Sequence, residues 1–487
     1  MKSKNVIRNY LYNSLYQLLT IITPIITTPY ISRVIGAEGI GTYTSTLGVS
    51  QLFCIIGMFG MLNYGSKSIA YVRDNSKELT RTFWNIWLVQ LIFSSISLFL
   101  YFAFFVKYNA LDLKEVFIIQ SPIVIGALFD ISWLYMGLED FKKTVSRNIL
   151  VKVVGIVCIF LFVKTSDDLY KYIAINSIST FLGILTLWMF VKQYVRRFDI
   201  STFKISEHLR GAFLMLIPQL SVHFYTGLDR TVIGSLSNDI EVGFYDQAQK
   251  ISRIALSLVT SLSTVLMPRI ANMFSKNNTE KIEEYLSKSL NFTVLISCLL
   301  MAGIMGVTND FVPIFFGEEF IAIIPYMIFT SLIVLFIPLG GVFANQYALP
   351  TGKNKEYITP LILAAVINIT LNIILVPKLG ALGGVISIIL TEFITMLIRV
   401  VSLRKYINIK KMTKGIYIYI VVAFITSIST IMFGKLFEPS IVSIIIEGVF
   451  CTVLYCILIY ISSSFIREEV KNIINKYNKR KNGGERI

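Results

Sequence analysis

Long apolar segments separated by short polar loops make up most of this chain. An α-helix rises 1.5 Å per residue, so about 20 apolar residues cross the ~30 Å hydrocarbon core of a bilayer. The pattern therefore predicts an all-α polytopic membrane protein with fourteen transmembrane helices. The expected helices lie near residues 10–32, 40–63, 83–106, 115–137, 148–164, 170–191, 211–234, 242–267, 288–307, 322–346, 357–376, 381–402, 415–434 and 440–464.

The composition excludes an ordinary soluble protein. Hydrophobic residues make up 55% of the 487 residues and charged residues only 15%, whereas soluble domains carry about 25% charged residues. All five cysteines lie within apolar windows, so we expect no disulfide framework. The sequence also lacks a Gly-rich phosphate loop, a nucleophile elbow and a His-rich metal site. We therefore expect no cofactor, no metal and no catalytic residue.

The net charge of +16 follows membrane topology. With the N-terminus assigned to the cytoplasm, 34 of the 45 Lys and Arg residues fall in cytoplasmic segments and helix edges, and seven fall in outer loops. Because basic residues accumulate in cytoplasmic loops, both termini are expected in the cytoplasm. The basic charge also attracts anionic membrane lipids, and nucleic acid is not an expected partner.

A short internal repeat divides the chain. Residues 33–36 (RVIG) precede Gly41-Thr42-Tyr43, and residues 230–234 (RTVIG) precede Gly243-Phe244-Tyr245. Six expected helices separate the copies, and an even number preserves orientation, so the halves are expected to be parallel repeats. The predicted divisions are a six-helix lobe over 1–200, a second over 201–410, two extra helices over 411–464, and a basic amphipathic tail over 465–487 that lies along the inner leaflet.

Four segments carry a resemblance to a known family. They are residues 28–41 (TPYISRVIGAEGIG), 130–140 (DISWLYMGLED), 229–234 (DRTVIG) and 377–384 (PKLGALGG). Together they resemble the bacterial lipid-linked oligosaccharide flippases, the Wzx-type polysaccharide transporters of the multidrug/oligosaccharidyl-lipid/polysaccharide exporter superfamily. The resemblance implies a multi-pass transporter of the bacterial cytoplasmic membrane. It further implies that the substrate is an undecaprenyl-pyrophosphate-linked oligosaccharide, moved to the outer leaflet by alternating access for export of surface polysaccharide.

Two cations of the eighth expected helix are the first candidates for substrate binding. Lys250 and Arg253 are three residues apart and share a helix face, and Arg253 is expected near the bilayer midplane. Pyrophosphate suits such a pair, because a guanidinium offers two parallel donors to phosphate oxygens. The alternative is a structural salt bridge to Asp229 or Asp246.

Two further cations occupy equivalent places in the repeat. Arg33 and Arg230 lie at the outer ends of the first and seventh expected helices. Either one is a candidate for receiving the substrate phosphate at an outer gate. The alternative is that each interacts with the C-terminus of its own helix, where the helix dipole favours a cation.

Three acidic residues inside apolar windows are candidates for ion coupling. Glu392 has the deepest expected position, while Asp130 lies in the inner half and Glu447 in the outer half of its helix. A membrane-embedded carboxyl group can bind a proton or a sodium ion and thus couple transport to an ion gradient. For Glu392 the alternative is a pair with Arg399, two turns later on the same helix face.

Three other functions remain open. A cation-coupled multidrug antiporter of the same superfamily would need an acidic cavity, yet expected helices 7 and 8 are basic. A peptidoglycan lipid II flippase would share the helix number and a cationic cavity, and only the four signature segments argue against it. An enzyme such as a polysaccharide polymerase or ligase would need a sizeable outer loop, and the longest expected here, 308–321, has 14 residues. We therefore expect that the protein is not an enzyme.

Overall fold

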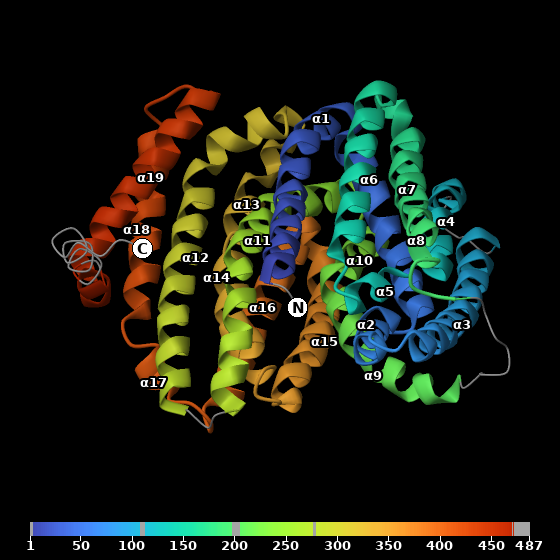
Figure 1. The fold of residues 1–487 in the computed structure, drawn as a ribbon. Coiled ribbons are helices and arrows are strands. Elements are labelled where there is room, and N and C mark those ends of the chain that lie inside the picture. Colours follow the sequence, from blue (N-terminus) through green and yellow to red (C-terminus); the bar gives the residue numbers. More distant parts are fainter. Residues whose placement is uncertain (1–2, 108–112, 197–204, 276–278, 470, 472–487) are drawn as a thin grey trace. The chain divides into compact units, whose positions relative to one another are not determined.

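The computed structural model describes residues 3–107, 113–196, 205–275, 279–469 and 471. Most of the predicted tail, residues 470 and 472–487, lies outside this part. The described residues form helices and no strand, which confirms the all-α polytopic membrane fold (Figure 1). The helices are α1 (Ser3–Met58), α2 (Met61–Val72), α3 (Ser76–Tyr101), α4 (Lys114–Phe129), α5 (Ser132–Gly137), α6 (Phe141–Phe162), α7 (Leu169–Thr186), α8 (Trp188–Val191), α9 (Ser206–Thr226), α10 (Leu228–Leu236), α11 (Asp239–Ser275), α12 (Thr279–Phe315), α13 (Ile324–Thr330), α14 (Ile333–Gly341), α15 (Asn354–Leu379), α16 (Ala381–Leu403), α17 (Ile409–Met412), α18 (Ile416–Gly434) and α19 (Ile441–Ser462).

Every predicted window is helical over most of its length, but three windows differ from the rest. In the part of the chain that the structure describes, ten helical runs are long and apolar enough to cross a membrane, and the first of them, Ile21–Val72, contains the window 40–63 and the second half of the window 10–32. The windows 115–137, 211–234 and 242–267 are not among these runs. The first two are broken into α4 and α5 and into α9 and α10, and the third carries Lys250 and Arg253. Polar residues in a membrane segment have to serve packing or function.

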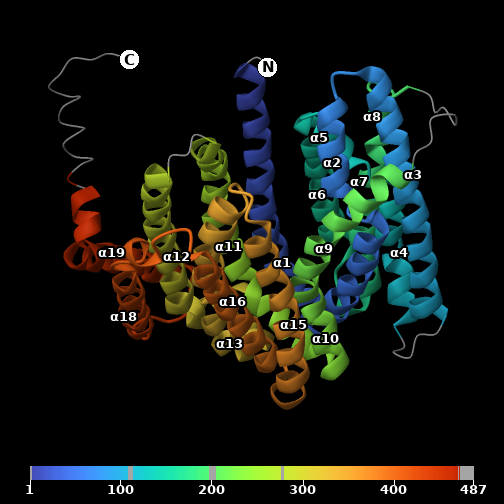
Figure 2. The same ribbon diagram turned by 90° about the horizontal axis from the view of Figure 1, so that it is seen from below.

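The chain folds into two compact units, each formed from two separate stretches of sequence. Unit 1 is Met1–Asp246 with Leu361–Ile388, and unit 2 is Gln247–Pro360 with Ile389–Ile487. The predicted lobes, 1–200 and 201–410, stay a prediction. In unit 1, α1 packs against α3, α4, α6 and α10; in unit 2, α12 packs against α14, α18 and α19 (Figures 1 and 2).

Unit 1 contains a broken helix whose freed backbone groups are satisfied by a glutamine. The chain leaves helical geometry at Asp130, between α4 and α5. Gln90 on α3 donates through Nε2 to the carbonyl oxygens of Ala127 (2.6 Å) and Asp130 (2.9 Å). Its Oε1 accepts from Nε1 of the fully buried Trp133 (2.9 Å). Because unpaired backbone groups are expensive in a membrane, these bonds explain how a break is tolerated here.

Unit 2 is organised by one apolar stripe on α12. Leu286, Leu290, Val294 and Cys298 follow each other at four-residue intervals and are all buried. This spacing puts them on one helix face, which packs in the same hydrophobic core as buried residues of α18 and α19. The Tyr455 hydroxyl of α19 also donates to the Leu295 carbonyl oxygen (3.0 Å). The two extra helices expected from the sequence are therefore packed against α12.

Two glycines of the internal repeat make a reciprocal close contact within unit 1. α1 is interrupted at Gly36, whose φ of 72° and ψ of −179° belong to a region open essentially to glycine alone. Just beyond, a Cβ added to Gly41 would collide with the carbonyl oxygen of Asp239, and one added to Gly243 with that of Ala37. The two equivalent segments therefore cross with their backbones in contact, which only glycine permits.

This crossing predicts that Gly243→Ala lowers the melting temperature of the detergent-purified protein. The added methyl group forces α1 and α11 apart, and overpacking of this kind costs ~1–3 kcal/mol. The matched control is Gly303→Ala in α12, where an added Cβ meets nothing within 4 Å. That control should be neutral or slightly stabilising, because alanine favours a helix by ~1 kcal/mol over glycine. Equal melting curves for the two variants would contradict the close crossing.

Candidate functional site

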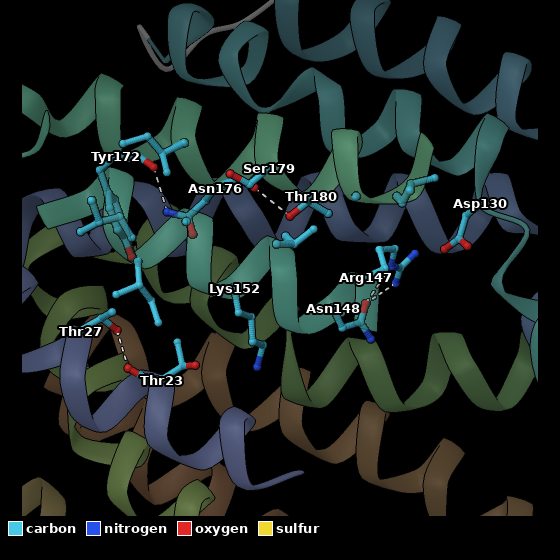
Figure 3. Close-up of a pocket in the computed structure, with 17 residues that line it drawn as sticks. Thr23, Thr27, Asp130, Arg147, Asn148, Lys152, Tyr172, Asn176, Ser179 and Thr180 are labelled. Atoms are coloured by element: carbon cyan, nitrogen blue, oxygen red, sulfur yellow. Dashed lines mark hydrogen bonds between the residues drawn. The ribbon is translucent and has the colours of Figure 1, made fainter. Parts of the chain in front are cut away.

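A cavity of about 410 Å³ lies within unit 1, between α1, α6, α7 and the junction of α4 and α5. Figure 3 shows the polar side chains that these elements contribute to its lining. Its size and its charged and amide lining residues distinguish this cavity from the small apolar voids of protein cores. The labelled polar residues that line it are Thr23, Thr27, Asp130, Arg147, Asn148, Lys152, Tyr172, Asn176, Ser179 and Thr180.

The charges of the cavity are unbalanced in favour of cations. Arg147 and Lys152 project from α6, and Asp130 supplies a carboxylate. One Asp130 oxygen already accepts from the backbone N–H of Ser132 (2.9 Å) at the start of α5. The Arg147 guanidinium donates through Nε (2.9 Å) and Nη2 (2.5 Å) to the Asn148 amide oxygen. The lining therefore favours an anion.

The α7 wall of the cavity offers hydrogen-bond acceptors. Asn176 donates through Nδ2 to the Tyr172 carbonyl oxygen (2.8 Å), and the Thr180 hydroxyl donates to the Asn176 carbonyl oxygen (2.8 Å). With these donors engaged, the amide oxygen of Asn176 and the lone pairs of Thr180 are suited to accepting hydroxyl groups. Such a wall suits a polyhydroxylated ligand.

Of the residues that line this cavity, only Asp130 is a functional candidate from the sequence. Arg147 was counted with a cytoplasmic loop, although α6 begins at Phe141, before that residue. The signal that could have revealed the wall is the polar stripe of Tyr172, Asn176 and Thr180 at four-residue spacing in an apolar window.

A second group of polar side chains lies within unit 2, on α11 and α16. Here the structure brings together two of the predicted residues, because the Glu392 carboxyl group interacts electrostatically with Arg253. Arg399, the alternative partner proposed for Glu392, also interacts electrostatically with this carboxyl group, and more strongly than Arg253 does. Lys250 lies one turn before Arg253 on α11 and is half-buried.

Several buried donors of this group have no partner among the described residues. Arg253 donates through Nη2 to the Gln249 amide oxygen (2.6 Å), but its Nε makes no hydrogen bond. The Nε of Arg399 and the Nε2 of Gln249 are likewise buried and unpaired. A buried donor without an acceptor costs ~1–3 kcal/mol. This concentration of donors is therefore suited to an anionic ligand.

Arg230 belongs to a separate ion network within unit 1. Its Nε donates to Asp246 (2.6 Å), and its Nη1 contacts Asp229 (3.3 Å) and the Thr226 carbonyl oxygen (2.8 Å). Asp229 is completely buried and also accepts from the Tyr245 hydroxyl (2.5 Å). The two acids considered as structural partners of Lys250 and Arg253 are thus hydrogen-bonded to Arg230, which they hold at the α10–α11 junction.

Arg33 is exposed, and its Nη1 donates to the Pro29 carbonyl oxygen of its own helix (2.8 Å). This contact is the one expected of a cation at a helix C-terminus. The structure brings Arg33 into none of the clusters described above.

Glu447 lies beside Asp310, an acidic residue that was expected in a loop from the sequence. Glu447 on α19 is 1% exposed, and its carboxyl group interacts electrostatically with the side chain of Asp310. The Ser443 hydroxyl donates a hydrogen bond to Oδ2 of Asp310 (2.9 Å). Asp310 was placed in the outer loop 308–321, but α12 continues to Phe315.

Comparisons with known proteins agree with the resemblance drawn from the four signature segments. A family model described as polysaccharide biosynthesis protein matches residues 6–274. The putative O-antigen transporter of Shigella dysenteriae is 23% identical over 376 residues, which cover 77% of this chain and 94% of that protein.

Solved structures share the fold. The lipid II flippase MurJ in an inward closed conformation aligns with a TM-score of 0.70 at 15% identity, over 95% of this chain and all of that one. An inward-facing multidrug resistance MATE family transporter of the MOP superfamily aligns with a TM-score of 0.60 at 16% identity, over 81% and 99% of the two chains. With more than half of its residues matched by the family model, this chain belongs to the polysaccharide biosynthesis protein family.

Proposed function

We propose that this protein is a flippase that moves a lipid-linked oligosaccharide across the bacterial cytoplasmic membrane by alternating access, for export of surface polysaccharide. The observation that carries the proposal is the cavity of unit 1, in which cations and amide groups are combined. The O-antigen transporter named above supports the substrate class. The fold shared with a lipid II flippase supports a transporter and not an enzyme.

The cavity supplies the chemistry that such a head group needs. Arg147 and Lys152 are proposed to bind the pyrophosphate, because charge-assisted hydrogen bonds to phosphate are strong in a site of low dielectric constant. Asn176 and Thr180 are proposed to accept hydrogen bonds from sugar hydroxyls. The prenyl chain would stay in the surrounding membrane lipid. In unit 2, Arg253 and Lys250 remain proposed phosphate ligands, whereas Arg33 and Arg230 stay predictions.

Two rival transport functions are less well supported. A multidrug antiporter for cationic compounds needs an acidic site, whereas this cavity combines two cations with one carboxylate. A peptidoglycan lipid II flippase would also bind a diphosphate, and the fold of MurJ is shared. The match to an O-antigen transporter over 94% of its length favours the polysaccharide substrate.

Ion coupling is proposed to use one of the embedded carboxyl groups. Glu392 is the first choice because it is 5% exposed and lies near two arginines. Asp130 lines the cavity, and the carboxyl group of Glu447 interacts electrostatically with Asp310. Each of these can bind a proton, and an ionised carboxylate can also hold sodium.

The proposed orientation places both termini in the cytoplasm. Single cysteines introduced at Lys410 and at Glu438, in a variant lacking the native cysteines, should react with an impermeant thiol reagent from opposite sides of the membrane. Both positions are exposed or half-exposed, so access is not the limit. Lys410 should react only when the cytoplasmic face is open to the reagent. Labelling of both from one side would overturn the orientation derived from the basic loops.

The proposed head-group site predicts that Arg147→Ala reduces transport of the lipid-linked oligosaccharide at least ~10-fold, because a lost charged hydrogen bond is worth ~1.5–3 kcal/mol. Arg147→Lys should retain part of the activity, since the charge remains but the two-pronged donor is lost. The measurement is leaflet transfer in reconstituted vesicles, normalised to protein content.

Lys142→Ala is the matched control, because Lys142 is exposed on the same helix and does not line the cavity. It should transport at the wild-type rate. Full activity of a stably folded Arg147→Ala variant would remove Arg147 from the head-group site.

A further inference from the structure

The group of polar side chains on α11 and α16 is composed so that an anion and a carboxylate would compete for the same arginines. Arg253, Arg399 and Glu392 together carry one more positive than negative charge when all are ionised, and the half-buried Lys250, one turn before Arg253, adds a further positive charge. Glu392 and Arg399 are 5% and 8% exposed. In such surroundings each charge depends on the partners within the cluster, because water screens little there.

The helix positions bring these groups to one place. Glu392, Thr395 and Arg399 follow at intervals of three and four residues and share one face of α16. On α11, Gln249 and Arg253 are four residues apart and hydrogen-bonded to each other. α14 packs on α16 through Phe336 and Phe393, whose ring centroids are 5.2 Å apart, and contributes no charged side chain. Among the described residues, the charged groups that act on Glu392 are Arg399 on its own helix and Arg253 on α11.

The cluster has more donors than its own acceptors satisfy. Gln249 is completely buried and its Nε2 has no acceptor among the described residues, and the same is true of Nε in Arg253 and Arg399. Glu392 alone therefore does not saturate the arginines. A phosphate group, with several acceptor oxygens, matches these donors better than one carboxylate does.

We propose that Glu392 acts as an internal counter-anion that a pyrophosphate head group replaces at Arg253 and Arg399, with uptake of one proton by Glu392. This inference rests on the proposed flippase function and names the residues that link substrate binding to a proton. When the phosphate oxygens reach the arginines, a new negative charge stands beside the carboxylate. A proton supplied by hydronium or by the acid form of the buffer then forms an O–H bond on Glu392, and no bond of the pyrophosphate is broken.

Replacement of one anion by the other has a definite dependence on pH. Binding that takes up a proton is weakened as the proton concentration falls. The affinity for pyrophosphate should therefore decrease with rising pH, by up to about tenfold per pH unit for one linked proton. Glutamine at position 392 resembles the protonated carboxyl group, so Glu392→Gln should bind pyrophosphate more tightly and without this contribution.

The test is calorimetric titration of the purified full-length protein with inorganic pyrophosphate, in two buffers of different ionisation enthalpy and at several pH values. Wild type should take up about one proton more per bound pyrophosphate than Glu392→Gln. The variant subtracts the protonation changes of pyrophosphate itself. Arg253→Ala and Arg399→Ala should each weaken the binding that is linked to proton uptake at least ~10-fold, as expected for loss of a charged hydrogen bond.

Glu356→Gln is the matched control, because Glu356 is a unit 2 carboxylate paired with Lys405 (3.2 Å) outside this cluster. It should show the proton uptake and affinity of wild type. Equal proton uptake in wild type and Glu392→Gln, or no pyrophosphate binding by wild type, would overturn the inference. Either result would leave the proposed function standing if the reconstituted protein still moves the lipid-linked oligosaccharide.

Discussion

Charge burial in a chain built to lie in lipid is the constraint on which the arrangement of this protein depends. An ionised side chain in an apolar interior requires a partner of opposite charge or several hydrogen bonds. Arg230 meets this requirement fully, since Asp229, Asp246 and a backbone carbonyl surround it. Asp310 accepts a hydrogen bond from the Ser443 hydroxyl (2.9 Å), whereas Oε1 of the neighbouring Glu447 is buried without a hydrogen-bond partner among the described residues. The Arg230 network is therefore complete within the protein.

The cavity of unit 1 and the α11–α16 cluster are not complete in the same way. The cavity of unit 1 holds two cations against one carboxylate. The α11–α16 cluster holds two arginines against Glu392 and leaves buried donors without acceptors among the described residues. An excess of positive charge and of donors is unfavourable in an empty apolar fold, and it is what an anionic, hydroxyl-rich substrate would relieve. The surplus of cations over carboxylates therefore distinguishes the two groups proposed for transport from the Arg230 network.

The fold could be predicted from sequence because membrane helices need long apolar runs, and each of the fourteen windows is helical over most of its length. The site was harder, since hydropathy windows end where polar residues begin although helices continue. Arg147 and Asp310 were both assigned to loops for this reason, yet they belong to α6 and α12. Glu392 and Arg399 could be considered together from the sequence because they share one helix face, and the structure shows an electrostatic interaction between them. The electrostatic interaction of Glu392 with Arg253 links two helices. The periodicity of a sequence shows which residues share a helix face, but it does not show which helices lie side by side.

The most direct measurement is leaflet transfer by the purified protein in sealed vesicles that contain a fluorescent lipid-pyrophosphate oligosaccharide and no ATP. The labelled lipid should change leaflet only when the protein is present. A neutral lipid-linked sugar without the pyrophosphate should be a poor substrate, because the unit 1 cavity selects an anion by charge. Transport of cationic dyes without movement of the sugar lipid would contradict the account and identify an antiporter instead.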